Sequence, residues 1–156
     1  MIWVDLVHTA HVLGGCILIG TGSGIAFFML MAHRSNDPYF VAQTASVVVI
    51  ADMIFTATAA ILQPISGFLL MQHLGWGLED RWLMISLGLY VVIGMFWLPV
   101  LGIQTRMRDE ARACLQTKTK LSPTYHRLYR IWFACGIPAF AAILVLLWLM
   151  VTRPAF

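Results

Sequence analysis

Long apolar runs separated by short polar links dominate the pattern of the chain. Four runs, at roughly 3–31, 45–72, 82–104 and 131–152, are each long enough to cross the hydrocarbon core of a bilayer, which takes about 20 helical residues. Short links favour antiparallel neighbours, so the pattern predicts an all-α fold, an integral membrane four-helix bundle. At 156 residues, the chain is expected to form a single domain over 1–156.

Basic residues gather in two of the three links. The link over about 105–130 carries seven of them and the first link adds Arg34, whereas the opposite side has only Arg81 and Arg153. Because positively charged links stay in the cytoplasm, we predict an N-out/C-out orientation with the 105–130 link inside. Its first part, about 105–113, mixes both signs of charge and is expected to continue the third helix into solvent.

Composition places the chain in the membrane class. It is 60% hydrophobic and 11% charged, with a mean hydropathy of +0.83, whereas soluble domains carry about 25% charged residues. We therefore expect membrane lipid as the surroundings and no nucleic-acid partner. The first apolar run is too long for a signal peptide and should be retained. Cys16, Cys114 and Cys135 form no C-x-x-C pair and are interpreted as packing residues.

The histidines fall into two groups at opposite sides of the predicted bundle. His8 and His11 lie near the start of the first span, three residues apart and therefore on one helix face. His73 ends the second span on the same side, while His33 and His126 fall at the cytoplasmic side. Ionisable residues at membrane depth mark functional sites by default.

Histidines inside a helical bundle can supply axial nitrogens to a haem iron. His11 together with His73 or His8 could bracket a porphyrin in the outer half, and His33 and His126 could serve a second haem. The alternative interpretation is structural. In it, His8 and His73 are hydrated at the interface, and His11 hydrogen-bonds to a neighbouring helix.

Two arginines lie where the fourth span meets the cytoplasm. Arg127 and Arg130 can be interpreted as headgroup anchors, with an aromatic belt formed by Tyr125, Tyr129 and Trp132. They can also be interpreted as a clamp for porphyrin propionates, since arginine forms bidentate pairs with carboxylates.

Other polar groups lie at membrane depth in the second span. Asp52 is expected to pair with a basic residue such as Arg106 or Arg130, with proton transfer as the alternative. Gln63 precedes Pro64 and is expected to satisfy backbone groups that the proline frees.

Small and sulfur-containing residues favour packing roles. Gly20 and Gly24 form a small-x-x-x-small pair that predicts a helix contact. The nine methionines suggest copper binding as an alternative to haem, because thioethers are soft ligands that copper accepts. Met29 and Met31 are two residues apart, however, and do not share a helix face, so we expect the methionines to fill the core.

Three runs carry a family resemblance. They are A-H-V-L-G-G-C-I-L-I-G-T-G-S-G in the first span, D-M-I-F-T-A-T-A-A-I-L-Q-P in the second and Y-H-R-L-Y-R-I-W-F-A-C in the fourth. The chain resembles, over nearly its whole length, a bacterial family of predicted integral membrane proteins of unknown function. The resemblance implies a multi-pass protein of the bacterial inner (cytoplasmic) membrane.

The chain is also distantly similar to the HemJ-type protoporphyrinogen oxidases and the related CopD-like membrane proteins. Those small bundles hold haem b through a first-helix histidine, and His11, in A-H-V-L-G, matches it. The resemblance implies a porphyrin site between the helices and electron exchange with the quinone pool. Their third-span lysine ligand has no counterpart here, because W-L-M-I-S-L offers Ser86. The second ligand is therefore expected to be His73 or His8.

These patterns together predict a membrane protein that binds haem b, or another porphyrin, and takes part in electron transfer or porphyrin oxidation. Quinone or a membrane redox complex is the expected partner, and an enzymatic activity would be of the protoporphyrinogen-oxidase type. The alternatives are a cofactor-free accessory subunit or transporter component, and a copper carrier.

Overall fold

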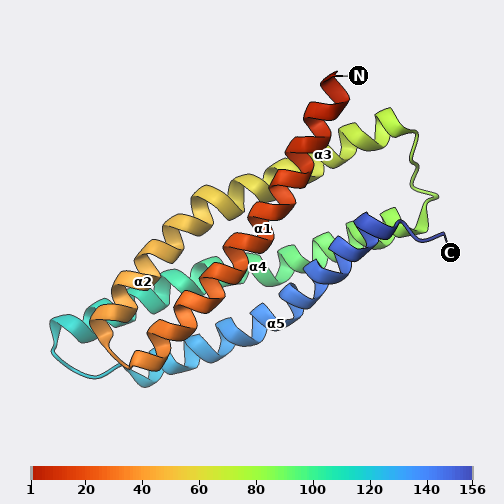
Figure 1. Cartoon of the computed structure of the whole chain (residues 1–156). Helices are drawn as coiled ribbons and strands as arrows, with labels where there is room; N and C mark the ends of the chain where they lie inside the picture. Colours follow the sequence, from red (N-terminus) through yellow and green to blue (C-terminus); the bar gives the residue numbers. More distant parts are fainter. Residues whose placement is uncertain (1, 156) are drawn as a thin grey trace.

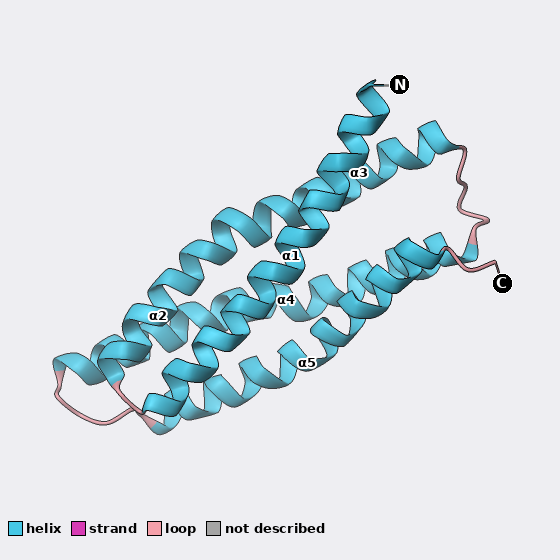
Figure 2. Ribbon diagram, viewed as in Figure 1, coloured by secondary structure: helices cyan, strands magenta, loops and turns pink. Residues whose placement is uncertain are grey.

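The computed structural model describes residues 2–155, and this range contains helices and no strand (Figure 2). The end residues of the predicted domain, Met1 and Phe156, lie outside it. Four helices are long and apolar enough to cross a membrane, which confirms the predicted four-helix membrane bundle. The elements are α1 (Ile2–Ser35), α2 (Pro38–Ala51), the π-helical turn η1 (Asp52–Thr56), α3 (Ala57–Leu74), α4 (Arg81–Gln116) and α5 (Pro123–Thr152).

The second span is built from α2, η1 and α3, which follow one another without a break. α1 packs along α2 and α3, while α4 packs along α5 and α2. Both termini lie at the same end of the bundle as the link between α3 and α4 (Figure 1). We call this the terminal end. The opposite end, which holds the two basic links, is called the basic end.

Side-chain caps fix where two of the helices begin. The Asp37 carboxylate accepts a hydrogen bond from the Tyr39 backbone N–H at 2.9 Å, and the Ser122 hydroxyl accepts one from the Tyr125 N–H at 3.0 Å. A proline follows each cap at the first helical position, where its missing N–H costs nothing. These caps start the helices several residues before the apolar runs begin.

The predicted boundaries therefore differ from the observed ones in a consistent direction. The second helix begins at Pro38 instead of residue 45, and the fourth begins at Pro123 instead of residue 131. The predicted continuation of the third helix past residue 105 is confirmed, and it runs to Gln116. Hydropathy shows where lipid surrounds a helix, whereas capping residues decide where the helix ends.

The main buried core lies toward the basic end, where side chains of α1, α2, α4 and α5 meet. A smaller cluster at the terminal end joins α4 to α5 through Trp82, Leu83 and Leu149. In Figure 1, the α1–α3 pair and the α4–α5 pair lie close together at the basic end and diverge toward the terminal end. The core residues at the basic end are Ile25, Met29, Ala32, Val41, Ala42, Ala45, Val48, Val100, Met107, Ala111, Leu121, Tyr125, Tyr129 and Trp132.

The packing contact predicted for Gly20 and Gly24 is wrong. A Cβ placed at either glycine would meet nothing within 4 Å. The glycines that do face another helix closely are Gly14 and Gly67. The small-x-x-x-small spacing identifies a helix face of low bulk, but the register of the helices decides whether that face meets a neighbour.

The role predicted for Gln63 belongs to a different side chain. Pro64 has no N–H, so the Ala60 carbonyl four residues earlier loses its helical partner. The Tyr90 hydroxyl of α4 donates to that carbonyl. Gln63 instead donates to the carbonyl of His11 on α1, at 2.8 Å. Tyr90 thus links the middle of α4 to the proline position of α3.

Candidate functional site

The imidazole of His11 lies against α3, hydrogen-bonded to Ser66. His11 Nδ1 and Ser66 Oγ are 2.8 Å apart. The Ser66 hydroxyl has a single proton, which it donates to the Leu62 carbonyl of its own helix at 2.7 Å. The serine oxygen therefore accepts from His11, and this requires the Nδ1–H tautomer. The lone pair on Nε2 is then free, and Nε2 makes no hydrogen bond to any of residues 2–155.

Small residues let α1 and α3 approach at this level. A Cβ at Gly14 would lie 2.8 Å from Gln63 Nε2, and a Cβ at Gly67 would lie 3.3 Å from His11 Cε1. Together with the bond from Gln63 to the His11 carbonyl, these contacts close the two helices around His11. A porphyrin has no room within this contact itself.

Sequence reasoning missed Ser66, Gly67 and Gly14 as parts of this site. One signal was available, since Gln63, Ser66 and Gly67 are spaced i, i+3, i+4 and therefore share one face of α3. A stripe of polar and small residues in an apolar helix is typical of an interhelical polar contact. The sequence does not predict which helix this stripe contacts, because that depends on the register between neighbouring helices.

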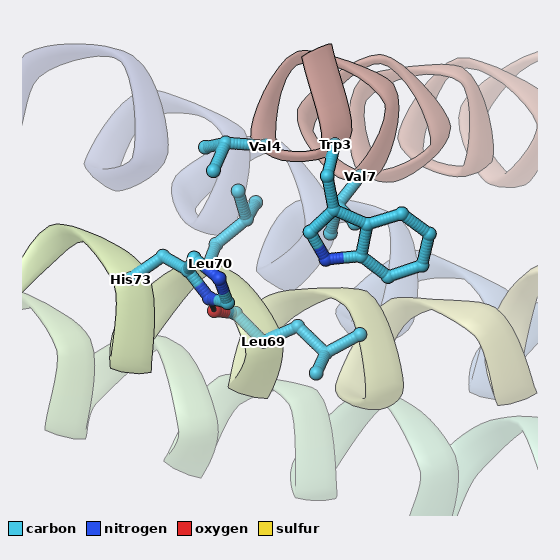
Figure 3. Close-up of a pocket in the computed structure, with 6 residues that line it drawn as sticks. All are labelled: Trp3, Val4, Val7, Leu69, Leu70 and His73. Atoms are coloured by element: carbon cyan, nitrogen blue, oxygen red, sulfur yellow. Dashed lines mark hydrogen bonds between the residues drawn. The ribbon is translucent and has the colours of Figure 1, made fainter. Parts of the chain in front are cut away.

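His73 lies apart from His11. It is seven residues beyond Ser66, about 10 Å further along α3, and its Nδ1 lies 3.0 Å from the carbonyl oxygen of Leu69 in the same helix. Figure 3 shows its ring in a small pocket near the start of α1. The pocket is too shallow to hold a water molecule and is lined by Trp3, Val4, Val7, Leu69, Leu70 and His73. The structure does not bring His11 and His73 together.

His8 does not complete the site either. It is exposed on the surface of α1, beside Val12 and Leu13, whose side chains are also exposed. His8 and His11 stand three residues apart on one helix, so both would approach an iron from the same side. Opposite axial ligands must come from two sides. The described residues therefore offer one well-oriented histidine at this level, His11.

The basic end holds the second histidine group. The rings of His33 and Tyr129 stack in parallel, with 3.6 Å between centroids and 5° between planes. The His126 ring packs on His33 in a T-shaped arrangement, with 5.6 Å between centroids. The two histidine rings pack directly on each other, with no space between them for a porphyrin. Within residues 2–155, four buried polar atoms of this cluster have no partner: His33 Nδ1, Tyr125 Oη, Tyr129 Oη and Trp132 Nε1.

The aromatic belt predicted at the start of the fourth span is wrong. Tyr125, Tyr129 and Trp132 are only 0%, 7% and 6% exposed and belong to the main core. They face the other helices, where a belt would face lipid headgroups. The side chains of Arg127 and Arg130 make no hydrogen bond or ion pair with residues 2–155. Both guanidinium groups are thus free for a lipid phosphate or a ligand carboxylate.

Asp52 does not form the predicted ion pair with Arg106 or Arg130. The one ion pair within residues 2–155 joins Arg108 to Asp109 at 2.9 Å. The polar contact of Asp52 is with Trp97, whose Nε1 lies 3.5 Å from Oδ1. Nor does any group of three or more His, Cys, Asp or Glu side chains in the described range stand ready to hold a metal ion.

The comparisons with known proteins bear on the chain as a whole. No curated protein and no solved structure matches it. One family does match, over residues 5–154, and it is described as "Predicted integral membrane protein (DUF2269)". The match runs from the first turns of α1 to the residues just after α5. The chain therefore belongs to the DUF2269 family of predicted integral membrane proteins.

Proposed function

We propose that this chain is a haem b-binding membrane protein that takes part in electron transfer, with His11 as an axial ligand. The observation that carries the proposal is the hydrogen bond between His11 Nδ1 and Ser66 Oγ. Histidines that bind metals nearly always donate their other ring N–H to a fixed acceptor, which sets the tautomer and the ring orientation. His11 has this arrangement, with Nε2 left for the iron.

The protein's own groups would orient the ligand and keep water away. Ser66 holds the ring, and the Gln63 amide holds the backbone of α1 at the same residue. Apolar helix surfaces around this level lower the local dielectric, which is one of the means by which proteins tune a haem potential. Haem b would supply one-electron iron chemistry. Quinone or a membrane redox complex is the partner that the distant HemJ and CopD similarity suggests.

The proposal assigns a single histidine ligand. His73 and His8 do not lie beside His11, so His11 is the one histidine at this level that would hold a haem iron. A haem held by one histidine would give a high-spin spectrum and would bind carbon monoxide or cyanide readily. An iron held by two histidines would instead give a low-spin spectrum that these ligands hardly change.

The test compares two histidine variants in protein made by cells supplied with ample haem precursor. His11→Ala should lose most of the bound haem, measured as haem per chain after detergent purification. His73→Ala is the matched control, since its ring bonds only within its own helix, and it should keep the wild-type haem content. Equal haem content in both variants would contradict His11 as the ligand.

A cofactor-free role, as an accessory subunit or transporter component, is the second candidate. The same contacts favour it, because His11, Ser66 and Gln63 satisfy one another across the α1–α3 contact. In that case the haem-supplied wild type would show no haem absorbance, and His11→Ala would lower only the unfolding midpoint. Metal analysis of the same sample tests the copper alternative.

A further inference from the structure

The stack of His33 on Tyr129 is the point where α1 meets α5 at the basic end. The two ring centroids are 3.6 Å apart, and the ring of His126, from the preceding turn of α5, also packs on His33. Tyr129 is 7% exposed, and its hydroxyl has no hydrogen-bond partner within residues 2–155. Because buried hydroxyls are normally bonded, this contact holds a donor that the described chain leaves without an acceptor.

An arginine follows each member of the stacked pair. Arg34 follows His33, and Arg130 follows Tyr129. α1 runs from the terminal end to the basic end, and α5 runs in the opposite direction (Figure 1). Two antiparallel helices are related by a two-fold axis perpendicular to both, so the residues that follow a contacting pair lie on the same side of the contact. Arg34 and Arg130 therefore lie on one side of the α1–α5 contact.

The positive charges of these two arginines are not neutralised by the described chain. Both are exposed, and neither side chain makes a hydrogen bond or an ion pair with residues 2–155. The acidic side chains at the basic end make other contacts: Asp109 pairs with Arg108, Glu110 accepts from Ser122, and Asp37 caps α2. Two unpaired like charges on one side of a contact attract an anion from outside the chain.

Apolar side chains continue from each arginine into the membrane. Phe133 and Ile137 lie three and seven residues deeper than Arg130, and thus on the same face of α5. Phe27 lies seven residues deeper than Arg34 on α1. Phe27, Phe133 and Ile137 are 57%, 45% and 59% exposed. A ligand at this contact therefore meets two cations at the membrane surface and apolar side chains below them.

We propose that Arg34 and Arg130 bind the phosphate of one anionic phospholipid at the α1–α5 contact, with its acyl chains on the apolar faces below. Arginine forms bidentate hydrogen bonds with phosphate, and basic pockets between spans on the cytoplasmic side bind lipid headgroups. A phosphodiester supplies both the negative charge and the hydrogen-bond acceptors. A soluble phosphate would leave the apolar faces uncovered, and this favours the lipid.

The lipid site is separate from the haem proposal. His33 is 22 residues beyond His11, which is about 33 Å further along α1. The two sites share no residue and lie toward opposite ends of this helix. Failure of either proposal therefore leaves the other standing.

The test is native mass spectrometry of the detergent-purified full chain during titration with phosphatidylglycerol. The wild type should bind the first phosphatidylglycerol more tightly than further copies, and more tightly than phosphatidylcholine, whose headgroup has no net charge. Arg34→Gln and Arg130→Gln should each weaken the first binding step about fivefold, as expected for the loss of one basic side chain at the membrane surface. Both side chains are exposed, so neither substitution disturbs the core.

Arg106→Gln is the matched control and should keep the wild-type affinity. It removes an exposed arginine of α4 whose side chain makes no hydrogen bond or ion pair with residues 2–155. An equal loss in all three variants would show a general attraction to the basic surface and would overturn the site. Wild-type affinity in either Arg34→Gln or Arg130→Gln overturns it as well, and so does equal affinity for phosphatidylcholine.

Competition with glycerol 3-phosphate distinguishes the two sources of phosphate. At a concentration equal to that of the lipid, it should not displace phosphatidylglycerol, because it has no acyl chains to cover the apolar faces. Displacement under these conditions would show that the arginines bind a soluble phosphate and would overturn the lipid assignment.

Discussion

At the scale of single residues, the hydrogen bond between His11 and Ser66 determines what the site can do. Without it the imidazole could adopt either tautomer, and no particular nitrogen would be presented to a ligand. The serine selects the Nδ1–H form because its own proton is already donated to the Leu62 carbonyl. The same residue thus serves both helix packing and the orientation of a candidate ligand.

Ser66→Ala should weaken haem binding about 10- to 100-fold, the usual cost of losing the group that orients a metal-binding histidine. The free energy of unfolding should fall by about 1 kcal/mol. Haem titration of the detergent-purified protein measures the first effect. Ser23→Ala is the control, because the Ser23 hydroxyl bonds only to the Ile19 carbonyl of its own helix. If the two variants bind haem equally, Ser66 has no orienting role.

At the scale of elements, close contacts between helices depend on where a polar side chain and a small residue meet. The sequence identified His11 and Gln63 as important, but their partners lie 55 and 52 positions away along the chain. Such pairings follow from the register of α1 against α3, and the hydropathy pattern does not specify that register. The aromatic residues of α5 show the same limit, because tyrosine and tryptophan are common both in interfacial belts and in cores.

Gly14→Ala tests the approach of α1 to α3. The new Cβ would displace the Gln63 amide from the His11 carbonyl, since it would lie 2.8 Å from Nε2. Losing that hydrogen bond costs about 1 kcal/mol in the free energy of unfolding. Because both glycine-to-alanine changes gain equally in helix propensity, Gly14→Ala should be about that much less stable than Gly20→Ala in mixed detergent micelles. Gly20→Ala places the same methyl group where nothing lies within 4 Å and should not destabilise the protein. Equal destabilisation by both substitutions would contradict the close approach at Gly14.

A double-mutant cycle tests the link between Tyr90 and Pro64. Tyr90→Phe should cost about 1–3 kcal/mol, because it leaves the Ala60 carbonyl without a donor in an apolar environment. In a Pro64→Ala background, the new N–H of residue 64 can bond to that carbonyl, so the same substitution should cost less. The coupling is read as the difference between the two unfolding free energies. Additive effects would show that Tyr90 does not compensate for the proline.

At the scale of the whole molecule, four apolar runs were enough to predict a four-helix membrane bundle, since each run matches the thickness of a bilayer. The sequence pattern gave less information on how the helices pack in the bundle. Hydropathy gave no sign that the main core would lie toward the basic end, nor that α1–α3 and α4–α5 would diverge at the terminal end. It also gave no sign of η1, because a π turn changes the hydrogen-bond register without changing the apolar pattern.

The distribution of basic residues predicts that the basic end faces the cytoplasm and that both termini lie outside. A green fluorescent protein fused after Arg153 and exported through the general secretory route should remain dark, while an alkaline phosphatase fusion at the same place should be active. Fusions in the link at 117–122 should give the opposite pattern. A fluorescent C-terminal fusion would show that the C-terminus lies in the cytoplasm and that the predicted orientation is wrong.

The measurement that tests the central claim most directly is the reduced-minus-oxidised visible spectrum of the purified wild-type chain, with haem quantified as its pyridine complex. The chain should come from cells supplied with ample haem precursor. Haem held through His11 predicts b-type haem at close to one per chain and a spectrum that shifts when carbon monoxide is added. A featureless spectrum from such cells would contradict the claim, and His11 would then be a residue that joins α1 to α3.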